Sequence, residues 1–145
     1  MAAARRKDGE YRNVSQAASI GASSLAALTP MAHVADVTRS LEWYVKLGFT
    51  VEHTLTAEGG ITQWAYLRNG GAELMLVRSA RPMNPDAQDV LFYLYANDVA
   101  QYREQLIAQG LKPSQLSYPP YARHGEFRID DPDGYCLLVG DTEQK

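Results

Sequence analysis

Two stretches of this chain repeat one arrangement of residues, and the repeat restricts the possible folds more than any other feature. Asp36 and Gly48 enclose apolar residues spaced three and four positions apart, and Asp98 and Gly110 enclose a second such stretch. Asp98 follows Asp36 by 62 positions, and Gly110 follows Gly48 by the same 62. This spacing predicts an amphipathic helix that aspartate caps and glycine ends. The chain is therefore predicted to contain one structural unit twice.

Strands are predicted in the same order around both helices. Segment 29–35 precedes the first helix, and "FTVEHTL", "ITQWAYLR" and "AELMLVR" follow it. Asn69-Gly70 joins the last two, because both residues tolerate the positive φ of a two-residue hairpin turn. In the second half, "VLFYLYA" comes first, and an extended piece at 112–116 and the hairpin "EFRID" with "YCLLV" follow the helix. The residues at 131–134 suit a type I turn.

The repeat predicts an α+β fold of two βαβββ modules, residues 29–80 and 88–140, joined by the linker "RPMNPDAQD". One module alone leaves a sheet face bare, so paired modules either bury that face or enclose a cavity. We expect the pair to form a cup-shaped mixed sheet with the helices on its outer face. The domain then spans residues 29–140, and 141–145 form a tail.

Residues 1–28 differ in composition from the predicted domain. They are rich in Ala and Ser and carry basic residues at 5–7, but no long apolar stretch follows, as a secretory signal would require. Asp8 and Glu10 count against an organellar transit peptide. We expect a loosely ordered N-terminal extension, with a helix docked on a partner subunit as the alternative.

Composition and charge exclude several classes of partner. The net charge of −3, without a Lys/Arg-rich block in the body of the chain, argues against nucleic acid. No apolar run approaches the ~20 residues of a membrane span, so we expect no membrane partner. Cys136 is the only cysteine, which excludes an internal disulfide and favours a reducing compartment. We expect a cytoplasmic protein.

The segments "HVADVTRSLEWYVKLGF" and "DPDGYCLLV", in this order of elements, resemble the vicinal oxygen chelate superfamily. That superfamily includes glyoxalase I, fosfomycin-resistance enzymes, extradiol dioxygenases and bleomycin-resistance proteins. The resemblance covers residues 29–140 and implies the paired-module fold. The matching residues are strand ends, helix caps and turns, so they indicate the fold far more than the function.

In metal-using members of that superfamily the cup holds a divalent ion, and the resemblance places its ligand positions at Thr29, Glu73, Leu91 and Leu138. Such an ion needs several oxygen or imidazole donors at once, and leucine offers none. A carboxylate at position 138 would be costly to bury without a cation, so an apolar residue fits a site without metal. We therefore expect no metal ion and no cofactor.

No catalytic residue is assigned. Cys136 lies in an apolar strand, where a thiol is usually inert, and no Ser/His/Asp arrangement is evident. Acid–base catalysis by Glu73 or Glu126 stays open, because burial can raise the pKa of a glutamate. Surface or hydrogen-bonded roles are expected for the three histidines, His33, His53 and His124.

Hairpin register indicates which side chains line the cup. A turn at 69–70 would pair Tyr66 with Glu73 and Trp64 with Met75, and paired residues share a face. The resemblance places Glu73 inside, so the other three follow it.

In the second hairpin two registers are open. A bulge at Gly134 would pair Arg128 with Leu138 and leave Glu126, Arg128 and Cys136 inside, whereas a tighter turn would put Glu126 and Arg128 outside. We predict an aromatic cup with a few charges, whose ligand-binding residues are Trp64, Tyr66, Glu73, Met75, Tyr93, Tyr95, Glu126 and Arg128. The alternative is that the aromatic residues fill a small core and Glu126 pairs with Arg128.

These features predict a metal-independent small-molecule-binding protein that resembles bleomycin-resistance proteins. An aromatic or cationic ligand would be held by stacking and cation–π attraction. The resemblance implies antibiotic resistance as a role and a homodimer as the assembly. Two alternatives stay open: a glyoxalase- or dioxygenase-like metalloenzyme with a displaced metal site, and a non-catalytic scaffold or regulatory partner.

Overall fold

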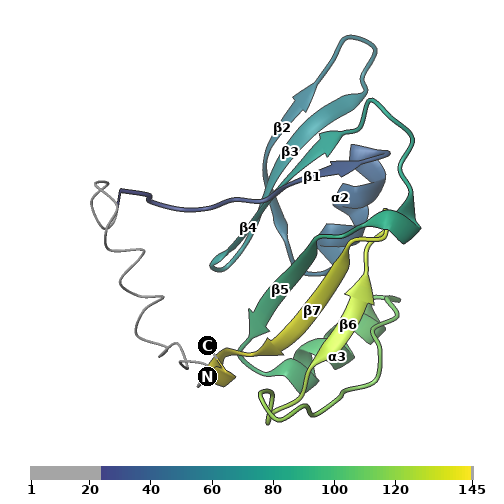
Figure 1. The fold of residues 1–145 in the computed structure, drawn as a ribbon. Helices are drawn as coiled ribbons and strands as arrows, with labels where there is room; N and C mark the ends of the chain where they lie inside the picture. The colour runs from purple at the N-terminus through teal and green to yellow at the C-terminus, as the bar shows by residue number, and fades with distance from the viewer. Residues whose placement is uncertain (1–23, 145) are drawn as a thin grey trace, which may run out of the picture.

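The computed structural model describes residues 24–144 and contains two separate mixed sheets, each with one helix against it (Figure 1). Most of the predicted extension, residues 1–23, lies outside the described residues, as does Lys145 of the predicted tail. No helix within 24–144 is long and apolar enough to cross a membrane.

The first sheet comes from the first predicted module. Its elements are β1 (Met31–Val34), α2 (Val37–Lys46), β2 (Thr50–Thr56), β3 (Thr62–Asn69) and β4 (Ala72–Arg78). The strand order is β1-β4-β3-β2, with β1 parallel to β4 and the other pairs antiparallel. The Asp36 side chain accepts a hydrogen bond from the Arg39 N–H, and Gly48 follows the helix at φ +101°. Both ends of the helix are therefore set by the residues that predicted them.

The second sheet repeats this plan with one strand fewer. Its elements are β5 (Leu91–Ala96), α3 (Val99–Ala108), β6 (Phe127–Asp130) and β7 (Cys136–Asp141), and short 3₁₀ turns are η1 (Pro85–Ala87) and η2 (Thr142–Gln144). The strand order is β5-β7-β6, with β5 parallel to β7. The extended piece predicted at 112–116 forms no strand, and only an isolated bridge joins Ser117 to Glu126. Proline at position 113 lacks the N–H that a sheet ladder needs.

Each helix covers one face of its sheet and leaves the other face uncovered. Helix α2 contacts β3 and β4, and α3 contacts β5 and β7. The residues facing the helices are nearly inaccessible, as Leu67, Leu76, Leu137 and Val139 show. Their sequence neighbours on these strands point the opposite way, because side chains alternate along a strand. The predicted α+β fold with helices on one side is thus confirmed.

The first hairpin has a turn one position later than predicted. Asn69 pairs with Ala72, so the two-residue turn contains two glycines instead of Asn-Gly. Tyr66 consequently lies opposite Met75, not opposite Glu73. The four side chains predicted to share a face still do so, because a shift of the pairing by two positions leaves each side chain on the same side of the sheet.

The second hairpin takes the wider of the two predicted registers. Arg128 pairs with Leu138, and the Asp131 N–H donates to the Tyr135 carbonyl over 2.9 Å. Gly134 closes the turn at φ +85°, which a side chain would strain. This register places Arg128 on the uncovered face of the second sheet.

The turn of this second hairpin also fastens the two modules together. Asp133 is 1% exposed, and its Oδ1 accepts hydrogen bonds from the Ala35 N–H (3.0 Å) and the Arg39 guanidinium (3.3 Å). Its Oδ2 accepts from the Ser40 hydroxyl (3.3 Å). The start of α2 is therefore held by a carboxylate more than 90 positions later in the chain.

Asp131 adds a second buried link. Its Oδ2 accepts from the Tyr44 hydroxyl over 2.8 Å, while its Oδ1 accepts from the N–H groups of Asp133 and Tyr135. Burial raises the pKa of Asp131 despite these bonds, and burial together with Asp131 raises the pKa of Tyr44. The Asp-Pro-Asp-Gly turn therefore links the two modules through buried hydrogen bonds.

Candidate functional site

The eight predicted ligand-binding residues lie in two groups, one on the uncovered face of each sheet. Strands β3 and β4 carry the first group, and β5 and the start of β6 carry the second. The first group is Trp64, Tyr66, Glu73 and Met75; the second is Tyr93, Tyr95, Glu126 and Arg128. The two sheets have no strand pairing between them within 24–144, so the eight predicted residues of one chain lie on two separate sheet faces.

In the first group Glu73 has a cationic partner from its own chain. The Arg68 guanidinium donates to Glu73 Oε1 over 2.9 Å, and the Thr29 hydroxyl donates to Oε2 over 3.1 Å. Hydrogen bonds from Tyr66 and Thr29 hold the pKa of Glu73 below its ordinary value. Arg68 also lies over the Tyr66 ring, with its central carbon 5.9 Å from the ring centroid. The carboxylate is therefore neutralised without a ligand.

The second group centres on Glu126, which is 6% exposed. The Tyr93 hydroxyl donates to Glu126 Oε2 over 2.6 Å, and the Tyr121 hydroxyl donates to Oε1 over 3.3 Å. Desolvation and the nearby Glu126 raise the pKa of Tyr121. The Tyr93 and Tyr95 ring centroids are 5.1 Å apart. Two phenols and one carboxylate thus form a compact polar cluster on an aromatic face.

Arg128 does not pair with Glu126, which was the alternative expected for a filled core. It forms an exposed ion pair with Asp130 at 3.0 Å instead. Tyr95 is 43% exposed, so the aromatic face of one chain is open. Tyr121 was missed by the sequence reasoning, because it lies in an irregular loop where no periodicity indicates orientation.

The four positions implied for a metal ion do not fit one. Thr29 and Glu73 lie together, but both Glu73 oxygens already accept hydrogen bonds from this chain. Leu91 and Leu138 lie on the second sheet and carry no donor atoms. Among residues 24–144, no group of three or more His, Cys, Asp and Glu side chains could hold a metal ion.

The histidines do not supply the missing donors at these positions. All three are exposed. His53 stacks on Tyr66, with centroids 6.2 Å apart, and His124 Nε2 lies 2.6 Å from Glu143. The surface or hydrogen-bonded roles predicted for His53 and His124 agree with these contacts.

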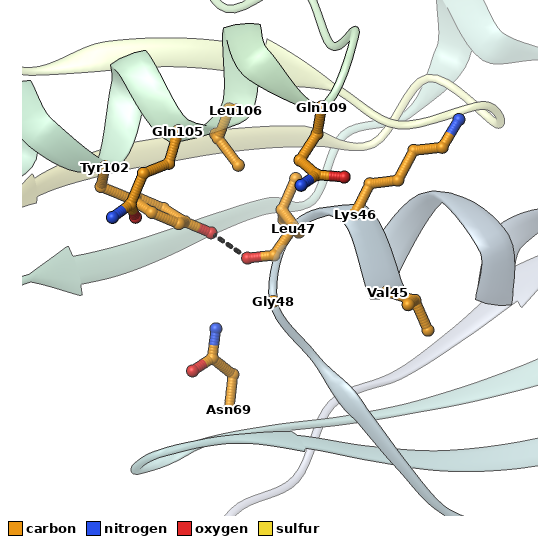
Figure 2. Close-up of a pocket in the computed structure, with 9 residues that line it drawn as sticks. All are labelled: Val45, Lys46, Leu47, Gly48, Asn69, Tyr102, Gln105, Leu106 and Gln109. Carbon is orange, nitrogen blue, oxygen red and sulfur yellow. Dashed lines mark hydrogen bonds between the residues drawn. The ribbon is translucent and has the colours of Figure 1, made fainter.

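Two cavities flank the tip of the β3–β4 hairpin. The larger, about 750 Å³, runs along the free edge of β5 and is lined partly by Tyr93 and Tyr95. The smaller, about 490 Å³, lies between the end of α2 and α3, where the Tyr102 hydroxyl donates to the Leu47 carbonyl over 2.6 Å (Figure 2). Both volumes are in the range of small-molecule pockets. Only the larger cavity includes predicted ligand-binding residues.

The sequence from 27 to 138 matches the model of the Glyoxalase/Bleomycin resistance protein/Dioxygenase superfamily. No curated protein matches the chain. Among solved structures, the bleomycin resistance determinant encoded on transposon Tn5 is 19% identical, with a TM-score of 0.68 over 82% of this chain and 99% of that one. The Streptomyces verticillus bleomycin-binding protein, complexed with copper(II)-bleomycin, is 19% identical, with a TM-score of 0.62 over 81% and 97%. A glyoxalase-related enzyme from Clostridium phytofermentans is 12% identical, with a TM-score of 0.65 over 81% and 95%.

Proposed function

Because the chain belongs to the glyoxalase/bleomycin resistance protein/dioxygenase superfamily, we propose that it binds an aromatic or cationic small molecule without a metal ion. One observation carries this proposal: both uncovered sheet faces are aromatic and open, while the expected ligand positions for a metal ion include two leucines. Aromatic faces with isolated charges suit flat or cationic guests. An open face also disfavours a scaffold with a filled cup.

We propose further that two copies of the chain close the cup. The uncovered faces expose large apolar side chains that water disfavours, which are Met31, Leu55, Leu91 and Tyr95. Contiguous exposed apolar surface commonly marks an interaction site. A homodimer that brings the first sheet of one copy opposite the second sheet of the other would join the two groups of predicted residues and shield these apolar side chains.

The biological role follows by analogy. The two structural relatives named for bleomycin support antibiotic sequestration as the role, and resistance as its consequence. The proposed location is the cytoplasm, because the one cysteine of the chain is buried and reduced, and needs no oxidising compartment.

A thermal-shift screen with aromatic ligands tests the proposal. Stabilising ligands should be found, and Trp64→Ala should weaken their binding by about 30-fold, because a buried aromatic anchor is worth about 2 kcal/mol. Ile107→Ala, an exposed apolar position on α3, is the matched control and should leave the shift intact. An absence of stabilisation by every ligand class, or an equal shift in the Trp64 variant, would refute the proposal.

A further inference from the structure

The two carboxylates among the predicted ligand-binding residues are compensated differently. Glu73 has Arg68 within 2.9 Å, but none of the ion pairs in residues 24–144 includes Glu126. Two basic residues lie two positions from Glu126, and each contacts another carboxylate: Arg128 pairs with Asp130, and His124 contacts Glu143. Glu126 is nevertheless the more buried of the two, so a charge there is largely shielded from water and has no ion-pair partner among residues 24–144.

A buried carboxylate without a cation is energetically unfavourable, and phenol hydroxyls compensate it only in part. Each oxygen of Glu126 accepts one phenol hydrogen bond, and each carboxylate oxygen has a second lone pair. A cation placed among these rings would supply the missing charge. The faces of tyrosine rings attract cations as well.

The two phenol partners of Glu126 differ in how firmly they are held. The Tyr93 bond is 2.6 Å and comes from strand β5, whereas the Tyr121 bond is 3.3 Å and comes from a side chain that is 64% exposed. The loop that carries Tyr121 is fixed by Ala122, which is fully buried and whose N–H donates to the Pro119 carbonyl. The Tyr121 side chain can therefore move aside while its backbone stays in place.

We propose that Glu126 is the anchor for a cationic nitrogen of the ligand, a protonated amine or amidine, and that the ligand's N–H displaces the Tyr121 hydroxyl from Oε1. The inference rests on the proposed function, and it says where the aromatic part and the cationic part of the ligand bind. In the proposed homodimer the aromatic part lies toward the first group of residues on the other copy, where Glu73 is already neutralised by Arg68. The cationic part lies at Glu126, with the Tyr93 and Tyr95 rings beside it.

Calorimetric titration with two matched probes tests this assignment. The probes are 1-naphthylmethylamine, which is a cation at pH 7, and its neutral counterpart 1-naphthylmethanol. The amine should bind at least about tenfold more tightly than the alcohol, which corresponds to one charge-assisted hydrogen bond. Glu126→Gln should abolish this preference by weakening amine binding about tenfold relative to alcohol binding, whereas Glu73→Gln, the matched carboxylate control, should retain it.

Tyr121→Phe provides an independent arm, because it removes the hydroxyl that competes with the ligand. Amine binding should then strengthen several-fold, so the preference for the amine over the alcohol should widen. Thermal unfolding of Glu126→Gln checks that the variant is folded, and loss of a buried uncompensated charge should not lower its melting temperature.

The outcomes separate this inference from the proposed function. If both probes bind equally and Trp64→Ala weakens both, the proposed function stands and the cation anchor is refuted. A preference that persists in Glu126→Gln also refutes it. If neither probe binds, the anchor is refuted for aryl amines, and the wider ligand screen decides the proposed function.

Discussion

Asp133→Ala should lower the free energy of unfolding by about 3 kcal/mol, because it leaves the buried Ser40 hydroxyl and the partly buried Ala35 N–H without an acceptor. Each buried donor left unsatisfied costs about 1–3 kcal/mol. The Arg39 contact adds little, since its side chain is 49% exposed. Urea unfolding followed by fluorescence measures the change.

Asp130→Ala is the matched control for this substitution. Asp130 lies in the same hairpin, but its ion pair with Arg128 is 52% exposed on the aspartate side, and such pairs contribute about 0–1 kcal/mol. The free energy of unfolding of the control should therefore lie within about 1 kcal/mol of the wild-type value. Equal losses in both variants would contradict the view that this turn holds the two modules together.

Gly134→Ala should be destabilising by about 2–5 kcal/mol, for two reasons that act together. A Cβ at this position would overlap the Pro85 carbonyl oxygen, so the backbone of η1 must move, and overpacking of this kind costs about 1–3 kcal/mol. The positive φ of +85° adds about 1–2 kcal/mol for any residue with a Cβ. Thermal and urea unfolding of the purified variant measure the loss.

Substitutions at two other glycines distinguish the contribution of steric overlap from that of the positive φ. A Cβ at Gly70 meets nothing within 4 Å but has φ +57°, so Gly70→Ala should lose only the conformational part, about 1–2 kcal/mol. Gly71 has open space and no positive φ, so Gly71→Ala should stay within about 0.5 kcal/mol of the wild type. A Gly134 variant no less stable than the Gly70 variant would show that contact with Pro85 is unimportant.

Local signals in the sequence predicted most of the fold, because helix ends and hairpins depend on a few neighbouring residues. Asp36 and Asp98 cap the helices that their spacing predicted. The first hairpin turn was placed wrongly, because the Gly70-Gly71 pair competes with Asn69-Gly70 for the same type of turn. The extended piece predicted at 112–116 forms no strand, since proline at position 113 lacks the N–H that a sheet ladder needs.

Contacts between distant parts of the chain could not be predicted from the sequence. The hydrogen bonds of Asp131 and Asp133 join residues some 90 positions apart, and no pattern in the sequence indicates which donors they meet. For the candidate site, alternation along β3 and β5 predicted which side chains share a face. It could not predict the ion pair of Arg68 with Glu73, or the position of Tyr121 in an irregular loop.

These two unpredicted contacts matter because they give the two groups of residues different charge environments. In the first group Arg68 neutralises Glu73, whereas in the second group the buried Glu126 has no ion-pair partner among residues 24–144. Neither group offers the set of oxygen and nitrogen donors that a divalent ion requires.

The central claim is that the protein grips its ligand without a metal ion. Calorimetric titration with the strongest ligand of the screen, before and after exhaustive treatment with a chelator and with elemental analysis of both samples, tests it directly. We predict the same affinity in both samples and no stoichiometric metal in either. Loss of binding after chelation, restored by adding back a divalent ion, would contradict the claim.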